Sequence, residues 1–245
     1  MRKELSMEPI VDYELLKPRE FNQRLAERPV GYLPLGTLEW HGEHSVLGAD
    51  SLQALELFRR AARQFGGIVF PPLWLGPDRI RIQEGGEALI GMDYDEATWP
   101  PRRLPGSCYW VSNALFALLL EAILVQAKRA GFRCIVADGH GPSRYLWADS
   151  VDTWEAQFNL KLVSAGRDFP DEWLSQIDHA GRNETSIMLA ADPDLVDLAR
   201  LPEDPDIWPQ GVAGEDPRLS SAEYGERLLE DTLKLIGEQL DRLGI

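Results

Sequence analysis

The sequence is poor in basic side chains. Its 245 residues include 25 Lys and Arg against 40 Asp and Glu, which gives a formal net charge of −15. Nucleic acids and anionic membrane surfaces are bound through clustered Lys and Arg, so this balance argues against both as partners. We therefore expect a small-molecule or peptide partner.

Cysteines and long apolar runs are also scarce. Cys108 and Cys134 form no CxxC pair and no disulfide framework, which favours a reducing compartment. The amino terminus alternates charged and apolar residues and lacks the apolar core of a signal peptide. The longest apolar run, from Ala114 to Val125, is interrupted by Glu121 and is too short to cross a bilayer. We predict a cytoplasmic protein.

The length and the 44% hydrophobic content suit one large α/β domain over residues 1–245. A helix, Gly131, a strand and then GHGPSRY follow one another, an order that favours a mainly parallel sheet with functional loops at the carboxyl ends of its strands. Residues 76–105 and 201–217 show no sustained period, and we interpret the first tract as a lid or an interface arm. The strands are expected at 30–35, 68–73, 132–138 and 161–164, and the helices at 18–27, 51–65, 112–130, 143–158, around 173, 184–190 and 220–243.

Ligand-type side chains follow the first predicted strand in the stretch LPLGTLEWHGEHSVLGAD, residues 33–50. In extended chain Glu39 and His41 point to the same side with Cα atoms roughly 6.5 Å apart, close enough to share an ion or a pair of ions. Asp50 is expected to join them, to cap the helix that follows it, or to do both. His44 is interpreted as a hydrogen-bonding residue behind the ligands, with a purely structural role as the alternative.

Two later segments carry the remaining histidines. His140 lies in Gly-His-Gly and His179 opens HAGRNETS, so each of the four histidines sits in a glycine-containing, ligand-rich segment. Carboxylates and imidazoles without thiolates suit Zn²⁺, Mn²⁺ or Fe²⁺, and five ligands exceed the need of one tetrahedral ion. A carboxylate-bridged pair of divalent ions would use them all and would hold a bridging hydroxide as nucleophile. Alternatively, His179 is a buried structural histidine and Glu184 only favours a helix amino terminus.

Four motifs together resemble the creatininase (creatinine amidohydrolase) family. LGTLEWHGEHSVLGAD is similar to that family's first metal-binding motif, and RLPGS to its Phe-Pro-Gly-Thr turn. DGHG is similar to its Asn-Gly-His-Gly, and HAGRNETS to its His-Ala-Gly signature. The likeness runs in order from about Val30 to Val196. It implies a three-layer sandwich with a mainly parallel central sheet flanked by helices.

The resemblance also implies two divalent metal ions per chain, Zn, Mn or Fe. Carried over residue by residue, Glu39, Asp50 and His140 would bind one ion, and His41 the other, with Asp50 as the bridge. The family's remaining ligand position is Pro142 in this chain.

The resemblance leads us to assign that ligand role to Glu184, which we also predict to be catalytic. His179 matches the family's proton donor or shuttle. Departures from the family concern the pocket: Ser175 replaces a substrate-covering Trp, a second Trp has no equivalent near Ala165, and Asp138 replaces the usual Asn.

These motifs predict a metal-dependent amidohydrolase that cleaves a cyclic amide, a formamide or a small peptide-like amide by attack of a metal-bridging hydroxide. The alternatives are a creatininase-family peptidase in peptide maturation and a non-catalytic metal-binding protein of the same fold. The resemblance further implies a homo-oligomer, often a hexamer, in which residues 76–105 reach a neighbour's active site.

Overall fold

The centre of the molecule is a four-stranded parallel sheet. In this computed structural model, which describes residues 9–174 and 177–245, the strands run in the order β2, β1, β5, β6. Their register pairs Val30 with Cys134 and Leu35 with Gly139 between β1 and β5. The strand bounds are Val30–Leu35 for β1, Ile68–Val69 for β2, Cys134–Gly139 for β5 and Lys161–Ser164 for β6.

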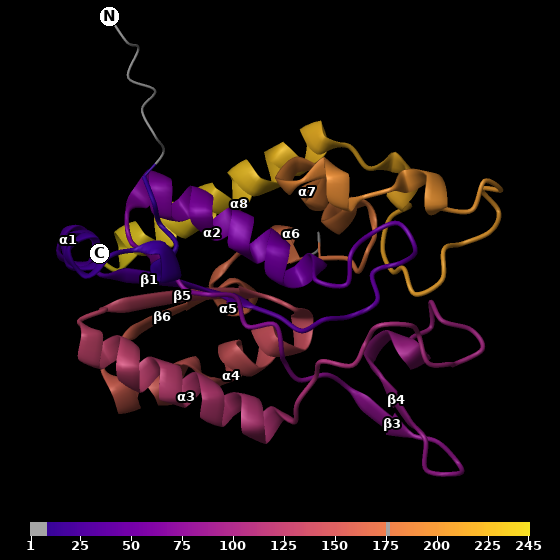
Figure 1. Cartoon of the computed structure of the whole chain (residues 1–245), viewed down its shortest axis with the longest axis horizontal. Helices are drawn as coiled ribbons and strands as arrows, with labels where there is room; N and C mark the ends of the chain where they lie inside the picture. Colours follow the sequence, from indigo (N-terminus) through magenta and orange to yellow (C-terminus); the bar gives the residue numbers. More distant parts are fainter. Residues whose placement is uncertain (1–8, 175–176) are drawn as a thin grey trace, which may run out of the picture.

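Helices cover both faces of this sheet and make a three-layer α/β sandwich, as predicted (Figure 1). α2, α7 and α8 lie on one face and α3 and α4 on the other. Shorter helices lie before β1 (η1 and α1) and between β6 and α7 (α5 and α6) in the chain. The helix bounds are Tyr13–Leu15 for η1, Pro18–Glu27 for α1, Ala49–Phe65 for α2, Asn113–Ala130 for α3, Gly141–Phe158 for α4, Ala165–Asp168 for α5, Asp171–Leu174 for α6, Arg182–Ala191 for α7 and Ala222–Arg242 for α8.

The alternation of buried side chains along the strands explains the two helical layers. Tyr32 of β1 and Val136 of β5 face the cluster under α2 and α8. Leu33 and Ile135, one position away, face the cluster under α3 and α4. Successive strand residues point to opposite faces, so strands buried on both sides read as continuous apolar runs.

Several boundaries differ from the sequence prediction. The strand expected over residues 68–73 ends at Val69, because Pro71 and Pro72 have no N–H to donate to a neighbouring strand. Residues 76–105 are not uniformly irregular: β3 (Ile80–Ile82) and β4 (Ala88–Ile90) form an antiparallel hairpin, followed by η2 (Gly91–Tyr94). This hairpin projects from the body of the molecule (Figure 1).

The helix caps show that one expected role of Asp50 was wrong. Asp50 is not an N-cap, because α2 already begins at Ala49 with Gly48 as its cap, so the Asp50 carboxylate is left in the first turn. Ser112 and Ser221 do cap α3 and α8, where their hydroxyls accept hydrogen bonds from Leu115 and Tyr224. The tract over residues 201–217 forms no α-helix or strand, as predicted; the 3-10 helices η3 (Pro193–Leu195), η4 (Leu198–Arg200) and η5 (Pro217–Leu219) lie in or beside it.

Two close backbone contacts fix the elements around the carboxyl edge of the sheet. Gly139 ends β5 with φ of +145°, and a Cβ there would lie 1.9 Å from the carbonyl oxygen of Leu35. Gly225 brings α8 against α7, because a Cβ at this position would lie 1.9 Å from the carbonyl oxygen of Ser186. Both positions therefore require glycine. Among the described residues, no helix is long and apolar enough to cross a membrane.

Candidate metal and active site

Three predicted ligands converge at the carboxyl ends of β1 and β5. Glu39 comes from the loop after β1, Asp50 from the first turn of α2, and His140 from the residue after β5. Nδ1 of His140 lies 3.0 Å from Oε2 of Glu39 and 3.2 Å from Oδ2 of Asp50. All three residues are buried, and their ligand atoms lie within 4.8 Å of one another.

A backbone contact orients the ring of His140. Its Nε2 lies 3.1 Å from the carbonyl oxygen of Pro77. A carbonyl oxygen only accepts, so Nε2 carries the proton and Nδ1 presents its lone pair to Glu39 and Asp50 when the ring is neutral. In metal-binding histidines, the ring nitrogen that does not bind the metal usually donates to a carbonyl or carboxylate oxygen in this way.

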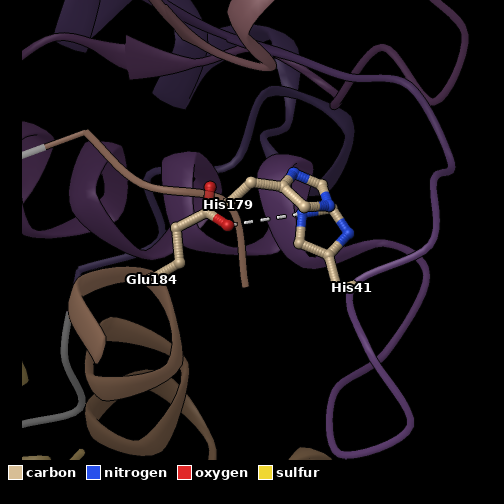
Figure 2. A group of neighbouring side chains, drawn as sticks. All are labelled: His41, His179 and Glu184. Atoms are coloured by element: carbon tan, nitrogen blue, oxygen red, sulfur yellow. Dashed lines mark ion pairs between the residues drawn. The ribbon is translucent and has the colours of Figure 1, made fainter. Parts of the chain in front are cut away.

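The second group consists of His41, His179 and Glu184 (Figure 2). Nε2 of His41 lies 3.5 Å from Oε2 of Glu184 and 3.7 Å from Oδ2 of Asp50. Nδ1 of His41 donates to the carbonyl oxygen of its neighbour Glu39, at 3.1 Å, which again leaves the other nitrogen facing the carboxylates. Oδ2 of Asp50 thus lies between the two imidazoles, in a position where one carboxylate can contact two ions.

His179 lies beside His41, with ring centroids 4.4 Å apart. Its Nε2–H donates to the carbonyl oxygen of Trp40 at 2.6 Å, and its backbone forms a two-way bridge with Ala213. The ligand-type atoms of His179 fall within 4.8 Å of those of His41 and Glu184. Its geometry is therefore compatible with ligation as well as with the predicted proton transfer.

Glu184 is held by the turn that precedes α7. Its Oε2 accepts from the backbone N–H of Ala180 at 2.7 Å, and Ala180 adopts a φ of +51°, which is uncommon for alanine. Asp178 accepts from the N–H groups of Asn183 and Glu184 at 2.7 and 3.0 Å. Strained backbone held by surrounding hydrogen bonds is common at functional sites.

His44 supports the same turn, in agreement with our interpretation of its sequence position. The hydroxyl of Thr185 donates to the carbonyl oxygen of Ala180, so its oxygen accepts from Nε2–H of His44 at 3.0 Å. Burial lowers the pKa of His44 to about 4. The ring is therefore neutral at ordinary pH.

The buried polar atoms are suited to a cation. Nε2 of His41 is buried and has no hydrogen-bond partner among the described residues. Burial opposes protonation of His41, but Asp50, Glu184 and Glu39 together outweigh it and raise the pKa of His41 to about 10. Burial raises the pKa of Glu184 to about 7. The cluster thus favours the protonated forms of His41 and Glu184. Divalent ions would replace these protons as the source of positive charge among the carboxylates.

Other residues at the site carried no clear sequence signal. Oδ2 of Asp78 lies 3.9 Å from Nε2 of His140, although Asp78 comes from the tract without periodicity. Burial raises its pKa to about 6. Arg144, whose Nε donates to Asp138, lines the same cleft. Ser175, the predicted replacement for a family Trp, lies outside the described residues.

The two donor groups open into one cleft with a volume of ≈ 720 Å³. Glu39, Asp50, His140, His179 and Glu184 all line it. This volume lies within the range of small-molecule sites.

The family model for creatininase, described as creatinine amidohydrolase, matches residues 14–240. The chain belongs to the creatininase family. A creatinine amidohydrolase from Pseudomonas putida is 25% identical over 256 residues, which cover 91% of this chain and 93% of that protein. This places the chain among the metal-dependent amidohydrolases, as the motifs predicted.

Solved creatininase structures share the fold. A variant with one tryptophan replaced by phenylalanine superimposes with a TM-score of 0.72 at 25% identity, covering 95% of this chain and 98% of the other. A manganese creatininase superimposes with a TM-score of 0.73 at 24% identity, covering 96% and 98%. The central sheet and its flanking helices are therefore those of a creatininase.

Proposed function

We propose that this chain hydrolyses a small cyclic amide with two divalent metal ions per chain. The observation that carries the proposal is the position of Asp50, whose Oδ2 lies 3.2 Å from Nδ1 of His140 and 3.7 Å from Nε2 of His41. One carboxylate facing two oriented imidazoles suits a pair of ions rather than a single one. When bound, such ions would polarise the amide carbonyl and supply a nucleophile near neutral pH.

The chain's own residues would divide the work as follows. Glu39, Asp50 and His140 would hold one ion, while His41, Glu184 and again Asp50 would hold the other. His179 is not needed to complete either set, so we retain it as the residue that moves a proton.

The hydrogen bond to Trp40 supports that role for His179. Because Nε2–H donates to the Trp40 carbonyl oxygen, a neutral His179 has its lone pair on Nδ1. Nδ1 can accept a proton as water attacks the amide carbon, and the resulting imidazolium can return it to the departing nitrogen. The Trp40 carbonyl would hold the ring during both transfers.

The test starts from chelator-treated protein reloaded with Mn²⁺ or Zn²⁺ and assayed on a panel of cyclic amides, creatinine included because the relatives are named for it. We expect close to two ions per chain and metal-dependent ring opening of at least one member. His140→Ala should lower kcat/KM by about 10³-fold or more. Glu43→Gln is the matched control, because Glu43 is an exposed carboxylate within the same motif.

The two roles of His179 are separable. His179→Asn should lower kcat with the metal content unchanged if the residue transfers protons. Loss of one ion per chain in this variant would instead assign His179 to the second metal site. A wild-type chain that binds fewer than two ions and opens no cyclic amide would refute the proposed function.

We also propose that the chain is a cytoplasmic homo-oligomer. The support for an oligomer is exposed apolar side chains within residues 76–105: Trp99 is 83% exposed and Ile82 is 64% exposed. Large exposed apolar side chains on an extended arm are typical of contact surfaces. Sedimentation velocity would test this, with Trp99→Ser expected to shift the chain towards smaller species.

A further inference from the structure

A second small cavity of ≈ 90 Å³ adjoins the cleft. The two cavities share Asp50, Glu184 and Arg144 among their lining residues, so this chamber begins at the proposed metal site. Its other walls are largely apolar and include Leu57 and Trp173. A group attached to a substrate at the metal site could therefore extend into this chamber.

Arg144 is fixed at the junction of the two cavities. Its Nε donates to Asp138, its stem lies 3.3 Å from the position of a Cβ on Gly166, and its guanidinium lies 5.8 Å from the ring centre of Trp173. The side chain is only 11% exposed. A guanidinium held in this way loses little further freedom when it binds a ligand.

The contacts of Arg144 leave hydrogen-bond donors unused. Asp138 accepts from Nε, whereas the Nη atoms have no hydrogen-bond partner in residues 9–174 and 177–245. Nε2 of Gln53, which lines the same chamber, is buried and also lacks a partner within these residues. Buried donors in native proteins are normally satisfied, and Nε2 of Gln53 is such a donor. Together with the Nη atoms of Arg144, which bond to no described residue, it indicates an acceptor group that arrives with a ligand.

Once metal is bound, most carboxylates around the chamber are paired or neutralised, so an anionic acceptor can meet the guanidinium of Arg144. Asp50 and Glu184 would be neutralised by the ions, Asp138 is paired with Arg144, and Asp178 accepts from the backbone at the start of α7. The Nη atoms of Arg144 and Nε2 of Gln53 then remain as hydrogen-bond donors without an acceptor among the described residues. A carboxylate offers acceptor oxygens in the planar arrangement that a guanidinium matches.

We propose that Arg144, assisted by Gln53, recognises a carboxylate on the substrate, so that this chain acts on acidic cyclic amides in preference to neutral ones. The inference rests on the proposed amide hydrolysis. It makes Arg144 a specificity-determining residue that contacts the substrate away from the scissile bond. The second arginine of the cleft, Arg79, is less suited to this role because it pairs with Asp95 and is more exposed.

The test compares matched ligands that differ only in a carboxylate. 5-Oxoproline and 5-oxoprolinamide form one pair, and hydantoin-5-acetate and hydantoin-5-acetamide form a second. Their Kd values would be measured by calorimetry on the full chain loaded with Mn²⁺. We expect the acid of at least one pair to bind about 10- to 100-fold more tightly than its amide. Arg144→Gln should abolish this preference.

Two further variants separate recognition from folding. Arg144→Gln alone leaves Asp138 buried without a partner, so the double variant Asp138→Asn with Arg144→Gln removes both charges together. It should also lose the preference while keeping the wild-type melting temperature within a few degrees. Arg144→Lys should retain part of the preference. Arg79→Gln, the matched control, should retain all of it.

The outcomes distinguish this inference from the proposed function. Acids and amides that bind equally to the wild-type chain would overturn the inference, and so would a preference that survives in Arg144→Gln, because the metal ions alone would then explain it. Binding preference without turnover of any amide would leave recognition by Arg144 in place and count against hydrolysis. Turnover of both ligands of each pair with equal kcat/KM would support hydrolysis and count against recognition by Arg144.

Discussion

Metal binding to the two donor groups should release protons, and the imidazoles determine how many. In the metal-free chain, burial opposes protonation of His41, but Asp50, Glu184 and Glu39 together outweigh it and raise the pKa of His41 to about 10. Burial likewise opposes protonation of His140, and the charges of Glu39 and Asp50 raise its pKa well above the ordinary value. Each ring must lose the proton on its ligand side before it binds an ion. We expect about two protons released per chain at pH 8 when both groups are filled.

The same count sets the pH dependence of affinity. Each released proton makes the overall association constant rise about tenfold per pH unit, so two protons give about 100-fold per unit near pH 8. Affinity therefore falls as the pH falls. Below about pH 7 the dependence should steepen, because burial raises the pKa of Glu184 to about 7 and its proton must also leave.

Calorimetric titration of the metal-free chain with MnCl₂ measures both quantities. At each of pH 6, 7 and 8, the slope of the observed enthalpy against the buffer's ionisation enthalpy gives the number of protons released. His140→Asn should reduce the count at pH 8 by about one. Glu43→Gln should leave it unchanged. A wild-type count close to zero at pH 8 would refute our account of the ligands.

Three further predictions concern single side chains. Asp50→Asn should reduce the metal content from two ions to about one and lower kcat/KM by about 10³-fold; elemental analysis showing two ions would contradict the bridging role. Gly139→Ala should lower the free energy of unfolding by about 3 kcal/mol or more, because its Cβ would lie 1.9 Å from a β1 carbonyl oxygen. Urea denaturation checks this against Gly141→Ala, where a Cβ meets nothing within 4 Å and the loss should stay below about 1 kcal/mol. Because burial lowers the pKa of His44 to about 4, the unfolded chain binds its proton more strongly, so stability should fall as the pH drops from 6.5 towards 4; His44→Gln should weaken that fall, and parallel curves for both proteins would argue against it.

The elements that depend on local pattern could be predicted from the sequence. The strand at residues 161–164 and the helix at 18–27 have the bounds that apolar periodicity indicated. Where the prediction was wrong, hydrogen-bonding partners decided the outcome. The hairpin within residues 76–105 has strands of three residues each, and only Leu89 among them is buried, so no alternation marks them. α2 begins one residue before Asp50, with Gly48 as a cap that uses no side chain.

The convergence of the predicted ligands could also be foreseen. They are His, Asp and Glu residues, which commonly bind metals, and they follow the ends of parallel strands, which meet at one edge of the sheet. Asp78 could not, since it reaches His140 through a loop whose path depends on tertiary packing. The orientation of each imidazole ring could not be predicted from the sequence either. It depends on the carbonyl oxygens of Pro77, Glu39 and Trp40. Every residue has a backbone carbonyl, so the sequence does not indicate which of them accepts a hydrogen bond from a histidine.

The close approach of α8 to α7 at Gly225 has a consequence for residues far from any ligand atom. Glu184 lies on α7, and α7 packs on α8, none of whose described residues belongs to either donor group. The carboxyl-terminal helix therefore positions the second donor group through α7. A change of packing at this contact would lower the affinity for metal without changing the residues that carry out the chemistry. Selection for tight metal binding in this chain would accordingly act on its last 25 or so residues as well as on its histidines.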